Sequence, residues 1–73
     1  SAARRVLTFG TSPQADICGH DIRLKDGKTC FSVSCDRFEQ DFELAMHGVF
    51  NVENALAAIA AAYLEGIPPE DMR

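Results

Sequence analysis

The chain has 73 residues, a net charge of −4 and an apolar share of 47%. These values suit one small folded domain and argue against a disordered or membrane-spanning segment, since no apolar run is long enough to cross a bilayer. Eleven acids outnumber seven bases and no basic stripe interleaves with aromatic residues, so the sequence also argues against nucleic-acid binding.

The three cysteines form an odd set, which predicts reduced thiols rather than a disulfide framework. Cys30 and Cys35 are not spaced like a zinc-binding pair, so no metal site is expected. Reduced thiols and the lack of a secretory signal at the start of the sequence indicate a cytoplasmic protein.

The size of the chain limits the core that it can form. A domain this small buries only ~60% of the surface of its unfolded chain. Alanine supplies much of the apolar share, and small side chains contribute little buried area each. We therefore expect a piece of a larger domain, whose other parts cover some of its apolar surface.

In chain order, the first predicted element is a short strand over Val6–Phe9, where adjacent apolar residues suit a strand covered on both faces. Thr11–Gln14 forms a turn, and Ala15–Leu24 forms a second strand. Gly19 interrupts the alternation of that strand and indicates a β-bulge.

The Asp26-Gly27 pair predicts a tight hairpin, because both turn positions need positive φ angles. It leads into a strand over Lys28–Cys35, with Phe31 and Val33 on one face. After a turn at Asp36-Arg37, the alternation returns over Phe38–Met46. Its apolar face comprises Phe38, Phe42, Leu44 and Met46, and its polar face comprises Glu39, Asp41 and Glu43. The result is a three-stranded antiparallel meander.

An alanine-dense helix follows, from about Asn51 to Glu65, with apolar residues at 3.6-residue spacing. Gly66 suits a left-handed residue after its end, and Pro68–Asp71 resembles the first turn of another helix. The alanines predict close packing of the helix on the sheet. The fold class is therefore α+β: a short strand plus the meander, packed on one helix.

Two asparagines are the candidate binding residues. Asn51 suits the N-cap of the helix, and Glu53 would complement the positive end of the helix dipole. Asn54 is a poor helix former that needs no second cap, and it shares a face with Asn51. Its carboxamide can match the donor and acceptor edge of adenine. For Asn51 the structural cap is a sufficient explanation by itself, and a nucleotide contact is the alternative.

The sequence contains no catalytic constellation and no candidate metal ligands. The two histidines, His20 and His47, lie near turns without partner acids at metal-ligand spacing, so solvated or capping roles are expected. No phosphate-binding loop, dinucleotide fingerprint or nucleophile elbow is present. Gly27-Lys28 belongs to the hairpin turn.

The motif Gly48-x-Phe-Asn-Val-x-Asn-Ala-Leu-Ala-Ala-Ile-Ala-Ala-Ala62, followed by Gly66-Ile67, resembles the Mur ligases, which add amino acids to the peptidoglycan precursor. Phenylalanine before the first asparagine is similar to the branch that adds the third residue, the UDP-N-acetylmuramoyl-tripeptide synthetases. By this resemblance, residues 1–73 are the C-terminal part of the ATP-binding central domain, within a larger α/β P-loop fold.

The resemblance implies ATP and Mg²⁺ as cofactors of the parent enzyme, with UDP-muramyl peptide and an amino acid as substrates. It implies that an acyl-phosphate forms on the growing peptide. It assigns the adenine contact to Asn54 and places Asn51 beside the nucleotide. The phosphate loop, the magnesium ligands and the flanking domains of the family are absent from these residues. The fragment alone is therefore expected to be inactive, to bind no cofactor tightly and to self-associate through apolar patches.

Two other interpretations stay open at this point. The chain could derive from a related ligase, such as folylpolyglutamate or cyanophycin synthetase, which shares the architecture. It could also be a non-catalytic α+β module whose alanine-rich helix docks on a partner. The amino acid that the parent adds cannot be read from these residues.

Overall fold

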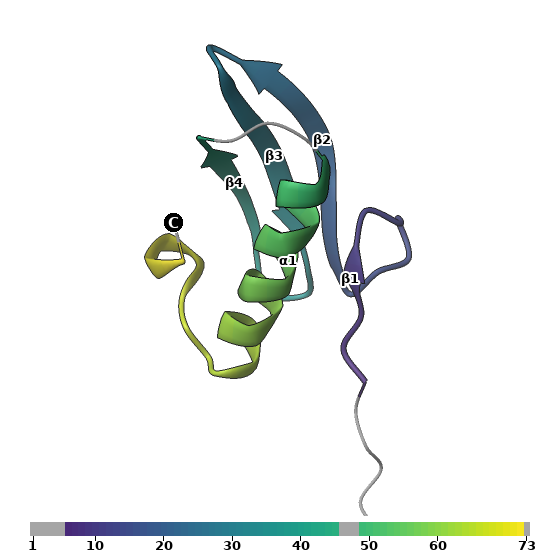
Figure 1. The fold of residues 1–73 in the computed structure, drawn as a ribbon. Coiled ribbons are helices and arrows are strands. Elements are labelled where there is room, and N and C mark those ends of the chain that lie inside the picture. Colours follow the sequence, from purple (N-terminus) through teal and green to yellow (C-terminus); the bar gives the residue numbers. More distant parts are fainter. Residues whose placement is uncertain (1–5, 46–48, 73) are drawn as a thin grey trace, which may run out of the picture.

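The computed structural model describes residues 6–45 and 49–72, which form a four-stranded sheet with one long helix packed on one face (Figure 1). The strands follow one another across the sheet in chain order; the first pair is parallel and the others are antiparallel. This confirms the predicted fold class. The elements are β1 (Phe9–Gly10), β2 (Ile17–Lys25), β3 (Lys28–Ser34), β4 (Glu39–Leu44), α1 (Val49–Leu64) and the short 3₁₀ helix η1 (Pro69–Asp71).

The first strand differs from the prediction. Only Phe9 and Gly10 pair with β2, and Val6 is 75% exposed, so a strand over Val6–Phe9 covered on both faces is wrong. The turn before β2 explains where pairing starts. The Asp16 carboxylate accepts hydrogen bonds from the backbone N–H and the hydroxyl of Thr8, at 3.0 and 3.1 Å. The Thr8 carbonyl then accepts the Ile17 N–H at 2.9 Å, which opens the parallel ladder.

The hairpin between β2 and β3 has the predicted turn. Lys25 and Lys28 face each other across it, with φ angles of 53° at Asp26 and 73° at Gly27. Positive φ at both central positions matches a type I′ turn, whose twist suits the flanking strands. The prediction of a tight Asp-Gly hairpin is confirmed.

The irregularity in β2 lies between His20 and Arg23, so the predicted bulge at Gly19 is wrong. Gly19 pairs in register with Val33. It is glycine because α1 approaches closely: a Cβ there would lie 2.9 Å from Cδ1 of Leu56. A glycine inside a strand can mark either a bulge or a close approach, and here it marks the second.

The core lies between α1 and the sheet face that it covers. The rings of Phe31 and Phe42 stack across β3 and β4 with their centroids 5.8 Å apart. The polar residues Glu39, Asp41 and Glu43 point away from this core, which confirms the predicted alternation of β4; Met46 lies outside the described residues. The buried cluster comprises Ile17, Phe31, Val33, Phe42, Val52, Leu56, Ile59, Ala60 and Tyr63.

The C-terminal end of α1 has the predicted cap. Gly66 has a φ of 76°, and its N–H donates to the Tyr63 carbonyl at 3.0 Å. The N–H of Ile67 donates to the Ala62 carbonyl at 3.0 Å, which completes a Schellman motif. The following Pro69–Asp71 segment is a 3₁₀ turn rather than an α-helical turn, and Met72 after it packs against the core.

Half of the six alanines in α1 do not pack on the sheet. Ala60 is buried, whereas Ala58 and its neighbours Ala57 and Ala61 are exposed. The expectation of close packing for all of them is therefore wrong. Six alanines within eight positions surround the helix, and only one stripe of a 3.6-residue helix can face the sheet.

Candidate functional site

The two candidate asparagines lie in the first two turns of α1, on nearly the same side of the helix. Because the helix already begins at Val49, Asn51 lies inside it, and the N-cap prediction is wrong. The same shift places Glu53 beyond the first turn, where it complements the helix dipole only weakly. The sequence pattern could not locate this start, because Val49 and Phe50 are apolar and carry no capping signal.

Burial separates the two asparagines. Asn51 is half-buried, whereas Asn54 is exposed. An exposed carboxamide on a fixed helix can donate and accept hydrogen bonds toward a ligand at the same time. The geometry of Asn54 is therefore compatible with a base edge, and the half-buried position of Asn51 suits a supporting role beside it.

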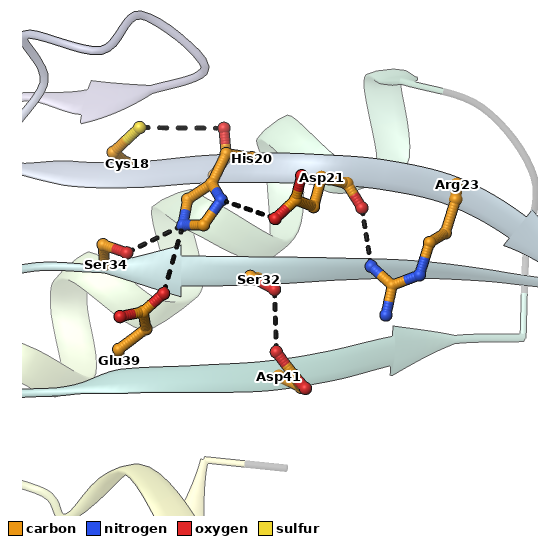
Figure 2. Close-up of polar contacts among 9 residues, drawn as sticks. Cys18, His20, Asp21, Arg23, Ser32, Ser34, Glu39 and Asp41 are labelled. Carbon is orange, nitrogen blue, oxygen red and sulfur yellow. Dashed lines mark hydrogen bonds and ion pairs between the residues drawn. The ribbon is translucent and has the colours of Figure 1, made fainter.

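A second polar cluster lies on the sheet face away from α1, as Figure 2 shows, and we call this face the open face. Nε2 of His20 lies 2.7 Å from the Ser34 hydroxyl, and its Nδ1 lies 3.2 Å from an Asp21 carboxylate oxygen. A carboxylate oxygen of Glu39 is 3.8 Å from the same Nε2. His20 therefore links β2, β3 and β4. The sequence-based expectation of a solvated or turn-capping histidine is wrong for this residue.

His20 contacts a carboxylate through one ring nitrogen and a serine hydroxyl through the other, which is the arrangement of an acid–base–nucleophile triad. Acyl transfer requires backbone donors beside the serine for the developing oxyanion. The N–H of Cys35, the residue after Ser34, already donates to the Phe38 carbonyl at 3.0 Å. We therefore assign this cluster to the joining of three strands. The pairing of His20 with Ser34 depends on the strand register, which the sequence pattern alone could not supply.

A third group fastens the turn between β3 and β4 to the end of α1. The hydroxyl of Tyr63 donates to the Asp36 carboxylate at 2.5 Å. The Arg37 guanidinium lies 3.9 Å from the centre of the Tyr63 ring and donates to the Tyr63 carbonyl at 2.9 Å. These contacts join the β3–β4 turn to the C-terminal end of α1.

Within residues 6–45 and 49–72, no three His, Cys, Asp or Glu side chains are grouped as metal ligands. His47 lies outside these residues. In the same part of the chain, no helix has both the length and the apolar character needed to cross a membrane.

Comparison with known proteins agrees with this structure. Residues 1–62 match the family model of the Mur ligase middle domain. The chain is 40% identical to a UDP-N-acetylmuramate–L-alanine ligase from Sinorhizobium medicae, over 94% of the chain and 16% of that protein. It is 37% identical to a UDP-N-acetylmuramoyl-L-alanyl-D-glutamate–2,6-diaminopimelate ligase from Halalkalibacterium halodurans, over 94% of the chain and 14% of that protein.

A second diaminopimelate ligase, from Lactiplantibacillus plantarum, is 40% identical over 96% of the chain and 14% of its own length. The four-stranded sheet and its helix are consistent with a part of that domain. The chain belongs to the Mur ligase family and matches its middle domain. It spans only 14–16% of the length of these relatives.

Proposed function

We propose that this chain contributes the adenine-side helix to a cytoplasmic, ATP-dependent ligase that joins an amino acid to a UDP-N-acetylmuramoyl precursor of peptidoglycan. The observation that carries the proposal is the exposed carboxamide of Asn54 on the second turn of α1, within a family of ligases. Since the relatives are about six times longer, the complete activity belongs to a longer parent protein.

The residues of this chain fit one part of ATP. The Asn54 carboxamide would bind the adenine edge, and Asn51 would hold the start of the helix beside it. ATP, when bound to the parent, would supply the phosphoryl group that activates the precursor carboxylate as an acyl-phosphate. The described residues offer no cluster for Mg²⁺, so the parent would hold the metal and the triphosphate elsewhere. The fragment alone would be inactive and would bind nucleotide weakly.

For the substrate, we propose addition of the third amino acid of the peptide. Phe50 before the first asparagine favours this branch, and two relatives are named as ligases of 2,6-diaminopimelate that act on UDP-N-acetylmuramoyl-L-alanyl-D-glutamate. In their named substrate two amino acids are already present, so the added residue is the third.

A second candidate is addition of L-alanine to UDP-N-acetylmuramate. It is supported by the L-alanine ligases from Sinorhizobium medicae and Parvibaculum lavamentivorans, both 40% identical to the chain. Assays of the parent protein with each precursor and its amino acid would separate the two. ATP consumption with UDP-N-acetylmuramoyl-L-alanyl-D-glutamate supports the third-residue proposal, and consumption with UDP-N-acetylmuramate and L-alanine alone overturns it.

The nucleotide contact can be tested on the chain itself by NMR. We expect the side-chain amide of Asn54 to shift on titration with ATP, ADP and AMP alike, because all three share the adenine. In Asn54→Ala this side-chain amide is gone, and we expect the nucleotide-induced shifts of the neighbouring backbone amides to disappear as well. Glu65→Gln, a change at the opposite end of the helix, serves as the matched control. Shifts that persist unchanged in Asn54→Ala would refute the assignment to this residue.

A further inference from the structure

Strand β4 forms one edge of the sheet. The strand order is β1-β2-β3-β4, and within the described residues no strand pairs with the outer side of β4. A six-residue edge strand presents a row of backbone N–H and C=O groups that can pair with another extended segment. In Figure 1, β4 lies at the edge of the sheet opposite β1.

An apolar groove of about 320 Å³ runs beside this edge, between β4, α1 and the residue after η1. Its floor comes from Phe42 and Leu44 of β4, and its wall comes from the small residues Ala58 and Ala62 of α1. Glu43 also lines the groove. Because its side chain is exposed and points to the open face, its contact with the groove means that the groove extends to the edge of β4. We call this feature the edge groove, lined by Phe31, Phe42, Glu43, Leu44, Ala55, Ala58, Ile59, Ala62 and Met72.

The acidic side chains of β4 determine which kind of extended segment can pair with this strand. The strand carries Glu39, Asp41 and Glu43 on the open face and has no basic residue. One lysine, Lys28, lies 3.4 Å from Glu43. The carboxylate of Asp41 accepts the Ser32 hydroxyl, which leaves its negative charge in place.

We propose that the β4 edge and the edge groove bind an extended segment of a partner protein, in which basic residues alternate with apolar ones. Along an added strand, successive side chains point to opposite faces of the sheet. Lysine or arginine would then lie beside the acids of β4, and the apolar residues between them would enter the edge groove. Backbone hydrogen bonds would supply affinity, and the alternation would supply specificity.

A second copy of this chain fits the same edge poorly. Two β4 strands paired with each other would bring acids opposite acids, and directly opposed like charges destabilise a strand pair. The acidic edge therefore disfavours pairing between copies while favouring a basic partner.

The proposal can be tested by NMR titration of the full 73-residue chain with a ten-residue peptide that alternates lysine and valine, at low ionic strength. We expect amide shifts confined to β4 and the edge groove, with slower hydrogen exchange at β4. The double change Glu39→Gln and Glu43→Gln should weaken binding about threefold to tenfold, because two exposed charge pairs are lost. Glu53→Gln with Glu70→Gln removes the same charge elsewhere and should leave the affinity unchanged.

A matched peptide with glutamate in place of lysine should not bind, and Ala58→Leu, which fills the groove, should weaken the lysine peptide without changing the fold. Four results would overturn the proposal: no shifts with the lysine peptide, equal binding of both peptides, shifts outside β4 and the groove, or β4 shifts that depend on protein concentration alone. The last result would identify a second copy as the occupant.

Discussion

At the scale of single residues, Gly19 and Ala58 show how one position can carry two meanings. A glycine within β2 predicts a bulge, but Gly19 pairs in register with β3, and the space above it is filled by Leu56 of the helix. An alanine within α1 predicts close packing, but its position on the helix turns it toward a groove. In both cases the sequence shows that the side chain is small, and only the tertiary arrangement shows which neighbour or space requires a small side chain there.

Gly19→Ala is expected to lower the free energy of unfolding by about 1–3 kcal/mol through overpacking. The new Cβ would lie 2.9 Å from Leu56 Cδ1 and 3.2 Å from its Cδ2, and Leu56 is fully buried. Urea unfolding measures the loss. In a Leu56→Val background the loss should be smaller, because the clashing methyl groups are drawn back; equal losses in both backgrounds would contradict the mechanism.

Two neighbouring alanines form a matched pair for the helix. Ala60→Leu should cost about 1–3 kcal/mol, because Ala60 is only 5% exposed against the core. Ala58→Leu should change stability by less than about 0.5 kcal/mol, since the side chain extends into the groove. Thermal unfolding of both variants checks the orientation of α1. Equal destabilisation would mean that the helix face is assigned wrongly.

At the scale of elements, the sequence predicts correctly those features that depend on neighbouring residues alone, such as turns and helix caps. Asp26-Gly27 and Gly66 have the positive φ angles that their turn and cap require, and the alternation of β4 sorts buried from exposed residues correctly. In the central strand β3, the alternation does not do so, because residues 29–33 are buried on both faces. The failures lie where a tertiary contact decides. Pairing in β1 starts where Asp16 binds Thr8, and α1 starts two residues before its first polar residue.

The candidate site divides in the same way. Asn54 stands out in the sequence as a candidate because asparagine is a poor helix former, and its role in binding stays a prediction. The cluster around His20 was missed, because Ser34 is fourteen positions away and only the register of β2 against β3 brings the two together.

Tyr63→Phe tests how firmly the β3–β4 turn is fastened to α1. The ring and its contact with Arg37 would remain, and the hydrogen bond from the hydroxyl to Asp36 would be lost. A hydrogen bond to a charged acceptor on a partly exposed turn is expected to contribute about 1 kcal/mol. Thermal unfolding should register this loss, whereas Asp36→Asn, which keeps an acceptor oxygen, should cost less. Unchanged stability of Tyr63→Phe would assign the fastening to Arg37.

At the scale of the whole molecule, charge and apolar surface are unevenly distributed. The β4 edge carries acids that discourage contact between copies. Elsewhere, large apolar side chains reach solvent: Leu64 is 68% exposed at the end of α1, and Leu24 is 66% exposed next to the hairpin. The chain spans 14–16% of the length of its relatives, and in the longer parent that we propose other parts would cover these side chains.

We therefore predict that the isolated chain self-associates through its exposed apolar residues and not through β4. Sedimentation equilibrium should give an average mass that rises with concentration, because apolar patches of this kind favour association. Leu24→Lys with Leu64→Lys should keep the chain monomeric. Both positions are exposed, so the two changes should leave the unfolding free energy within about 1 kcal/mol of the original. Glu39→Gln with Glu43→Gln should leave the wild-type association unchanged if β4 takes no part in it. A constant monomer mass for the wild-type chain would refute self-association, and stronger association of the β4 variant would show that the acids of β4 actively prevent pairing between copies.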